Sequence, residues 1–184
     1  MSDISISELE RRMRPRAWSE KGFLGPKERL MTVIRKDEAT LQRLGITHAQ
    51  IADKIEELIK IGEEETLARW RARDRTSWRI DRSPITVGQF SIIILGPYLG
   101  HQECPWSFYD PSTKPPRYKP CTVGSGPMYG DLDFVITNNR TGETLTGPGL
   151  IVHLIRDHHF FEGKQSPYRV DPEKAAGVLE LIKD

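Results

Sequence analysis

Side chains that commonly bind metals are concentrated in one part of the chain, between residues 101 and 159. Both cysteines and four of the five histidines of the 184-residue sequence fall in this interval: His101, Cys104, Cys121, His153, His158 and His159. Thiolate sulfur and imidazole nitrogen are typical zinc donors, and a structural zinc site uses four of them in a tetrahedron. The concentration of these residue types therefore predicts a site for one divalent metal, with zinc as the expected ion.

Helical periodicity selects among these candidates. At about 100° per residue, the helix predicted over Leu150–Phe160 places His158 within an apolar face. His153 and Asp157 lie at the edge of that face, and His159 points to solvent. A buried imidazole needs a partner for its ring nitrogens, because burial without one costs about 1–3 kcal/mol. The expected ligands are Cys104, Cys121, His153 and His158, with His101 in reserve.

The spacing of these residues leaves two other interpretations open. Sixteen residues separate Cys104 from Cys121, unlike the short Cys-x-x-Cys pattern that makes a zinc site recognisable. In the first alternative no metal binds, Cys104 is a small buried hydrophobe, and His158 is a hydrogen-bonded core histidine. In the second, three protein ligands and a water form the centre of a metal-dependent hydrolase, with Glu103 or Asp157 as the base.

Composition and charge limit the class of protein. Apolar residues make up 37% of the chain and charged residues 29%, and the net charge of +1 gives no general attraction to nucleic acids or acidic membranes. The N-terminal residues carry charges where a secretion signal needs an apolar core, and the longest apolar run, Ile92–Leu95, is far short of the ~20 residues of a membrane span. We therefore expect a cytoplasmic protein without a membrane partner, whose cysteines are thiols or ligands rather than a disulfide.

Two surfaces are candidates for binding a macromolecule. Residues 69–82 read RWRARDRTSWRIDR, and arginines mixed with tryptophans are typical of surfaces that bind single-stranded nucleic acid. The alternative, which we favour, places Trp70 and Trp78 in the core while the arginines pair with acids such as Glu63–Glu65. A loop rich in aromatic residues, from Trp106 to Tyr118, is a candidate patch for an unknown protein partner.

The elements that must position these residues change in character near residue 66. Before it, apolar residues recur at helical spacing over 6–13, 27–44 and 47–62, and the last of these segments begins with a capping box of Thr47 and Gln50. After it, β-branched residues at 79–80 and 85–95 and an alternating pattern over 132–136 predict strands. The turn residues 138–142 predict a hairpin, and Asp171-Pro172 predicts the start of a last helix running through Ile182.

These patterns predict an α+β fold with an N-terminal helical lobe, a small mostly antiparallel sheet and two C-terminal helices packed on it. The lobe takes residues 1–66 and the α+β domain residues 67–184, and we expect the two to pack as one unit. Within the second domain, residues 105–127 hold six of the thirteen prolines and show no period. A loop of this length is usually functional or disordered, and its aromatic residues predict that it packs down as a lid or wall.

Overall fold

The computed structural model describes residues 4–72, 81–98, 102–110, 112–121, 123–124 and 130–182. Five helices lie in these residues: α1 (Ile6–Arg12), α2 (Leu30–Leu44), α3 (His48–Ala72), α4 (Ile151–His158) and α5 (Pro172–Val178). The main sheet contains β1 (Ile85–Val87), β2 (Phe90–Leu95), β5 (Asp133–Asn138) and β6 (Thr144–Pro148). A separate hairpin pairs β3 (Phe108–Asp110) with β4 (Arg117–Lys119). The predicted α+β class is confirmed.

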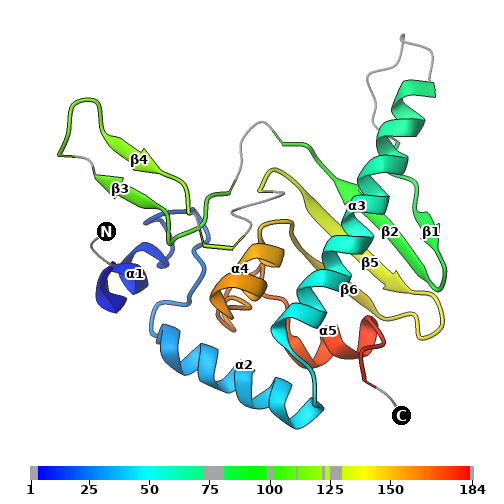
Figure 1. The fold of residues 1–184 in the computed structure, drawn as a ribbon, viewed down its shortest axis with the longest axis horizontal. Helices are drawn as coiled ribbons and strands as arrows, with labels where there is room; N and C mark the ends of the chain where they lie inside the picture. Colours follow the sequence, from blue (N-terminus) through cyan, green and yellow to red (C-terminus); the bar gives the residue numbers. More distant parts are fainter. Residues whose placement is uncertain are drawn as a thin grey trace.

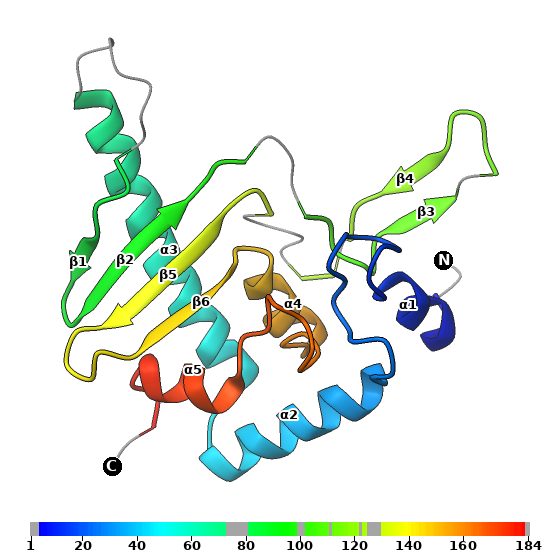
Figure 2. The same cartoon turned by 180° about the vertical axis from the view of Figure 1, so that it is seen from behind.

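The main sheet is antiparallel throughout, in the order β1-β2-β5-β6, and helix α3 lies across one of its faces (Figures 1 and 2). Alternate residues of β2 and β5 are buried, and Ile92 pairs with Ile136. Gly62 lets α3 approach the sheet closely, because a Cβ atom there would come within 2.9 Å of Cγ1 of Ile94. A turn at Gly88, where φ is 57°, divides the predicted strand 85–95 into β1 and β2.

Helix α3 begins where the sequence predicted but continues past the predicted end. Thr47 and Gln50 form the expected capping box, in which the Gln50 N–H donates to Thr47 Oγ1 (3.2 Å) and the Thr47 N–H donates to Gln50 Oε1 (2.8 Å). The predicted end at Gly62 is wrong, because this glycine is used for packing on β2 rather than as a cap. In the added turns Arg69 pairs with Glu65, as expected, but Trp70 is 55% exposed and not in the core. Trp78 and the predicted strand 79–80 lie outside the described residues.

Most of the segment predicted to be a lid or wall forms the β3–β4 hairpin, which projects from the body of the protein (Figures 1 and 2). The hairpin satisfies much of its own backbone hydrogen bonding, because its two strands pair with each other and Thr113 Oγ1 accepts the N–H of Arg117 at 2.8 Å in the connecting turn. Phe108 is 43% exposed. The base of this segment, at Trp106 and Cys121, packs against the core.

The C-terminal part of the chain agrees with the predicted elements, with shorter helices. Residues 138–142 form the turn between β5 and β6. Asp171 caps α5 by accepting the N–H groups of Glu173 (3.2 Å) and Lys174 (3.1 Å), but the helix ends at Val178 instead of Ile182. No helix in the described part of the chain combines the length and apolar character needed to cross a membrane.

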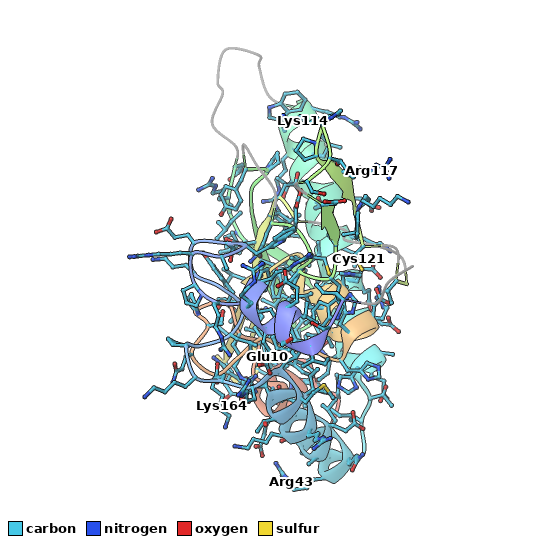
Figure 3. The ribbon with its side chains drawn as sticks, turned by 90° about the vertical axis from the view of Figure 1, so that its left-hand side faces the viewer. Glu10, Arg43, Lys114, Arg117, Cys121 and Lys164 are labelled. Atoms are coloured by element: carbon cyan, nitrogen blue, oxygen red, sulfur yellow. The ribbon has the colours of Figure 1, made fainter. Side chains whose placement is uncertain are left out.

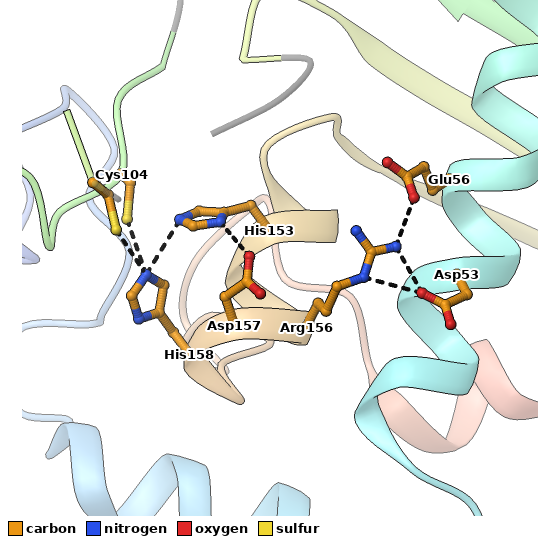
Figure 4. A network of polar contacts seen from close by, with 8 residues as sticks. Asp53, Glu56, Cys104, His153, Arg156, Asp157 and His158 are labelled. Atoms are coloured by element: carbon orange, nitrogen blue, oxygen red, sulfur yellow. Dashed lines mark hydrogen bonds and ion pairs between the residues drawn. The ribbon is translucent and has the colours of Figure 1, made fainter. Parts of the chain in front are cut away.

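Helix α4 is held near its C-terminal end and through the loop that follows it. On the side of α3, Arg156 pairs with Asp53 and Glu56, each at 2.7 Å (Figure 4). After the helix, His159 takes a left-handed conformation (φ 54°), and the chain turns back toward α2. There Arg169 donates to the backbone oxygen of Glu162 and pairs with the buried carboxylate of Asp37 at 2.6 Å. These contacts fix the position of the residues that α4 carries.

Glu162, in the loop after α4, is a fully buried carboxyl group that should make the stability of the fold depend on pH. Its Oε2 accepts a hydrogen bond from the Ser166 hydroxyl, and its Oε1 has no partner in the described residues. Burial raises the pKa of Glu162 from 4.5 to about 8, so the folded protein keeps a proton that the unfolded chain releases. Its contribution to stability is therefore fully present below pH 4.5 and is lost as the pH rises toward 8, at up to about 1.4 kcal/mol per pH unit.

We expect Glu162→Gln to remove much of this slope, so that the variant is more stable than the wild-type protein at pH 8. Urea unfolding at pH 5 to 8 measures the effect, and Glu173→Gln on the exposed surface of α5 is the control that should keep the wild-type slope. Equal slopes for the wild-type protein and Glu162→Gln would contradict a buried, protonated Glu162.

Candidate metal centre

Four side chains that the sequence predicted as metal ligands come together in the structure. Cys104, Cys121, His153 and His158 each offer one ligand atom, and these atoms all lie within 4.8 Å of one another. Nε2 of His158 is 3.4 Å from Sγ of Cys104, 3.3 Å from Sγ of Cys121 and 3.2 Å from Nε2 of His153 (Figure 4). The cluster joins the segments on either side of the β3–β4 hairpin to helix α4.

The distances within the cluster are close to those of a tetrahedral metal site. With Zn–N bonds of about 2.0–2.1 Å and Zn–S bonds of about 2.3 Å, neighbouring ligand atoms lie roughly 3.3–3.8 Å apart. The three contacts of His158 Nε2 fall at or just below this range. Hydrogen bonding alone explains them less well, because an imidazole nitrogen has one N–H or one lone pair in the ring plane, whereas three atoms surround Nε2.

Asp157 sets the orientation and tautomer of His153. Its Oδ2 lies 2.7 Å from Nδ1 of His153, four residues earlier in α4. With Nδ1–H donated to this carboxylate, the lone pair of His153 remains on Nε2, which faces the cluster. Asp157 therefore orients His153.

Both cysteines lie in turns whose backbone N–H groups point at sulfur. The N–H of Trp106 donates to Cys104, and the N–H of Val123 donates to Cys121. The hydrogen bond from the Cys104 thiol, together with the Val123 N–H and the nearby His158, lowers the pKa of Cys121 to about 4. Burial, followed by the proximity of Cys121, raises the pKa of Cys104. The pair thus loses one proton readily, and a bound cation would favour loss of the second.

Trp106 covers His158 at the outer side of the cluster. The two rings stack with centroids 3.9 Å apart and planes 7° apart. Burial lowers the pKa of His158, which keeps the imidazole neutral and able to donate a lone pair. The sequence predicted that His158 is the more buried histidine of α4, but His153 is only 1% exposed and His158 is half-buried. Periodicity within one helix cannot show this difference, because burial depends on packing against other segments.

The other residues considered from the sequence lie elsewhere. Glu103 precedes Cys104, but its side chain lines a cavity of about 550 Å³ with Trp18 and Tyr98 and does not belong to the four-residue group. His159 is exposed, as predicted, although its ring also stacks on another histidine. The reserve ligand His101 lies outside the described residues.

A second group, which the sequence did not indicate, brings Glu38, His48 and His159 within 4.8 Å of one another. The imidazole rings of His48 and His159 are stacked, with centroids 4.2 Å apart and planes 8° apart. Ring nitrogens donate in the plane of the ring, so two parallel rings do not point at a common ion. Burial lowers the pKa of His48, whose Nε2 has no partner in the described residues. This group lacks the convergent geometry of the first.

Asp157 gives a direct test of the metal centre. We expect Asp157→Ala to lower zinc affinity by about 10- to 100-fold, because His153 loses the hydrogen bond that holds its Nε2 toward the cluster. Competition with a chromogenic chelator measures the change. Asp53→Ala is the matched control, since it removes an acid that contacts α4 through Arg156 and leaves His153 untouched. Equal affinities for the two variants would mean that Asp157 does not support a metal ligand.

Comparisons with known proteins give no assignment of function. No protein-family model matches the chain, and searches of curated proteins and of solved structures find no similar protein. Function must therefore be inferred from the geometry of the four side chains.

Proposed function

We propose that this chain is a metal-binding accessory protein in which one zinc ion joins the base of the β3–β4 hairpin to helix α4. The ligands would be Cys104, Cys121, His153 and His158. The observation that carries the proposal is the convergence of these four donor atoms, from three separate segments, within 4.8 Å. Two buried free thiols also suit a reducing compartment, and we place the protein in the cytoplasm.

The donor set favours zinc over other divalent ions. Two sulfur and two imidazole donors match the Cys₂His₂ set of structural zinc sites. Magnesium and calcium prefer carboxylate and carbonyl oxygen, whereas the carboxylate of Asp157, beside the cluster, is hydrogen-bonded to His153. Tetrahedral placement of sulfur and nitrogen is typical of zinc.

A structural role fits the number of ligands. Four protein donors fill a tetrahedron, whereas a catalytic zinc keeps one position for water or substrate. Cys104 and Cys121 flank the hairpin in the sequence, so an ion bound to both would tie its two ends to α4. The ion would then connect the β3–β4 hairpin to the rest of the protein, with which the hairpin makes few other contacts.

Metal-dependent hydrolysis is the second candidate, and a cavity beside the cluster is the observation that favours it. This cavity, of about 290 Å³, is lined by His158, Asp157 and Trp106 and by apolar residues of α1 and α2. A water would have to replace one of the four protein ligands for this reaction to occur. Asp157 is the candidate base at this cavity, since Glu103 lines a different one.

Metal analysis of protein purified without an affinity tag tests the proposal. We expect about one zinc ion per chain, and we expect chelation to lower the melting temperature by roughly 5–10 °C, which corresponds to about 2–3 kcal/mol. Cys104→Ser, Cys121→Ser and His158→Ala should each lose most of the metal. His159→Ala, a change of the same type at the next residue, should keep it. Less than about 0.2 metal ions per chain in the wild-type protein would contradict the proposal.

Cobalt substitution separates the structural role from the catalytic one. A closed shell of two sulfur and two nitrogen ligands gives the intense visible absorption of tetrahedral Co²⁺, and added azide should leave the spectrum unchanged. A spectrum that shifts on addition of azide would reveal an open coordination position and favour the hydrolase.

A further inference from the structure

The projecting hairpin carries an excess of positive charge. Between Cys104 and Cys121 the chain has three cations, Lys114, Arg117 and Lys119, and one anion, Asp110. This segment has a net charge of +2, whereas the whole chain has +1, so the remaining residues together are slightly negative. The element that projects from the body of the protein thus carries a net positive charge of its own (Figures 1 and 2).

The cations of the hairpin are available to a partner. All three are exposed, and Figure 3 shows Lys114 and Arg117 at the far end of the hairpin, away from Glu10 of α1. Neither Lys114 nor Lys119 forms an ion pair with any residue that the structure describes. The carboxylate of Asp110 is engaged locally, since its Oδ1 accepts the N–H (2.9 Å) and the hydroxyl (2.6 Å) of Ser112. The positive charge is thus only partly balanced within the hairpin.

One face of the hairpin combines these charges with an aromatic ring. Phe108 pairs with Lys119, and Asp110 pairs with Arg117. Paired residues and alternate residues along a strand share a face, so Phe108, Asp110, Arg117 and Lys119 lie on the same side, which has two cations and one anion. In the connecting turn, Thr113 Oγ1 accepts the N–H of Arg117 and donates to the carbonyl oxygen of Pro115 (2.9 Å). This turn fixes the face before any partner arrives, which reduces the entropy lost on binding.

We propose that this face of the β3–β4 hairpin binds nucleic acid. Arg117, Lys119 and the nearby Lys114 would contact backbone phosphates, and Phe108 would stack on an unpaired base. A two-stranded ribbon is also narrow enough to enter the major groove of a duplex, where the same cations would reach the phosphates. The site differs from residues 69–82, for which the sequence first suggested nucleic-acid binding. The proposed metal would hold the base of the hairpin, but it contributes no contact at this face.

Fluorescence anisotropy with labelled 20-nucleotide DNA, single-stranded and duplex, tests the surface. We expect binding at 50 mM salt that weakens roughly 20- to 40-fold at 200 mM, as three phosphate contacts require. The triple variant Lys114→Ala, Arg117→Ala, Lys119→Ala should lose at least about tenfold in affinity at 50 mM salt and most of the salt dependence. Phe108→Ala should weaken single-stranded binding about tenfold and duplex binding less, because only an unpaired base stacks on the ring.

A charge-matched variant and a metal assay keep this test separate from the metal centre. Arg35→Ala, Lys36→Ala, Lys60→Ala removes three exposed cations from α2 and α3 and should bind DNA like the wild-type protein. An equal loss in this control, no binding at 50 mM salt, or binding to phosphatidylserine vesicles but not to DNA would each overturn the proposal. All hairpin variants keep the four metal ligands and should keep their metal. Hairpin-dependent DNA binding by a protein that lacks metal would count against the zinc centre and in favour of this surface.

Discussion

Four atoms of a kind that can bind a metal ion lie close together although they come from residues 104, 121, 153 and 158. Much of the architecture holds them in place. Helix α4 supplies two of the four atoms. Its Arg156 forms ion pairs with α3, and the loop after it is joined to α2 by the ion pair of Arg169 with Asp37. The other two atoms come from turns at the base of the hairpin. Because buried polar atoms cost free energy unless they are satisfied, the proposed ion would stabilise this arrangement by satisfying all four donors at once.

The parts of the fold that could be predicted are those encoded by a few neighbouring residues. The capping box at Thr47, the turn before β6 and the Asp171-Pro172 helix start depend on local hydrogen bonds and backbone preferences, and each is present in the structure. The errors concern contacts between distant segments. Gly62 has the local character of a helix end, yet its role is set by the strand beneath it. The β3–β4 hairpin has three-residue strands, too short to give a periodic pattern.

In the candidate site, too, local features could be predicted and contacts between distant segments could not. Residue type, together with the helical periodicity that set His159 aside, was sufficient to select the four side chains. The predicted relative burial of His153 and His158 was wrong, because burial depends on how α4 packs against the rest of the fold and not on its own periodicity. His153 and His158 are five residues apart, a spacing that does not place two side chains on one helix face, yet their ring centroids lie 4.8 Å apart at the end of α4. The backbone N–H groups directed at both sulfurs could not be predicted, because no local sequence motif indicates the turns that place them.

The separation of the ligands along the chain also has a consequence for biosynthesis. Zinc fingers with ligands a few residues apart can gather their ion early and fold around it. Here 54 residues separate Cys104 from His158, and the second half of the donor set sits on a helix that must first dock against α3. Before α4 has been synthesised, a nascent chain contains only two of the four proposed ligands, Cys104 and Cys121. Loading of the ion would therefore follow synthesis of most of the chain, and an occupied site would mark a molecule that has completed its fold.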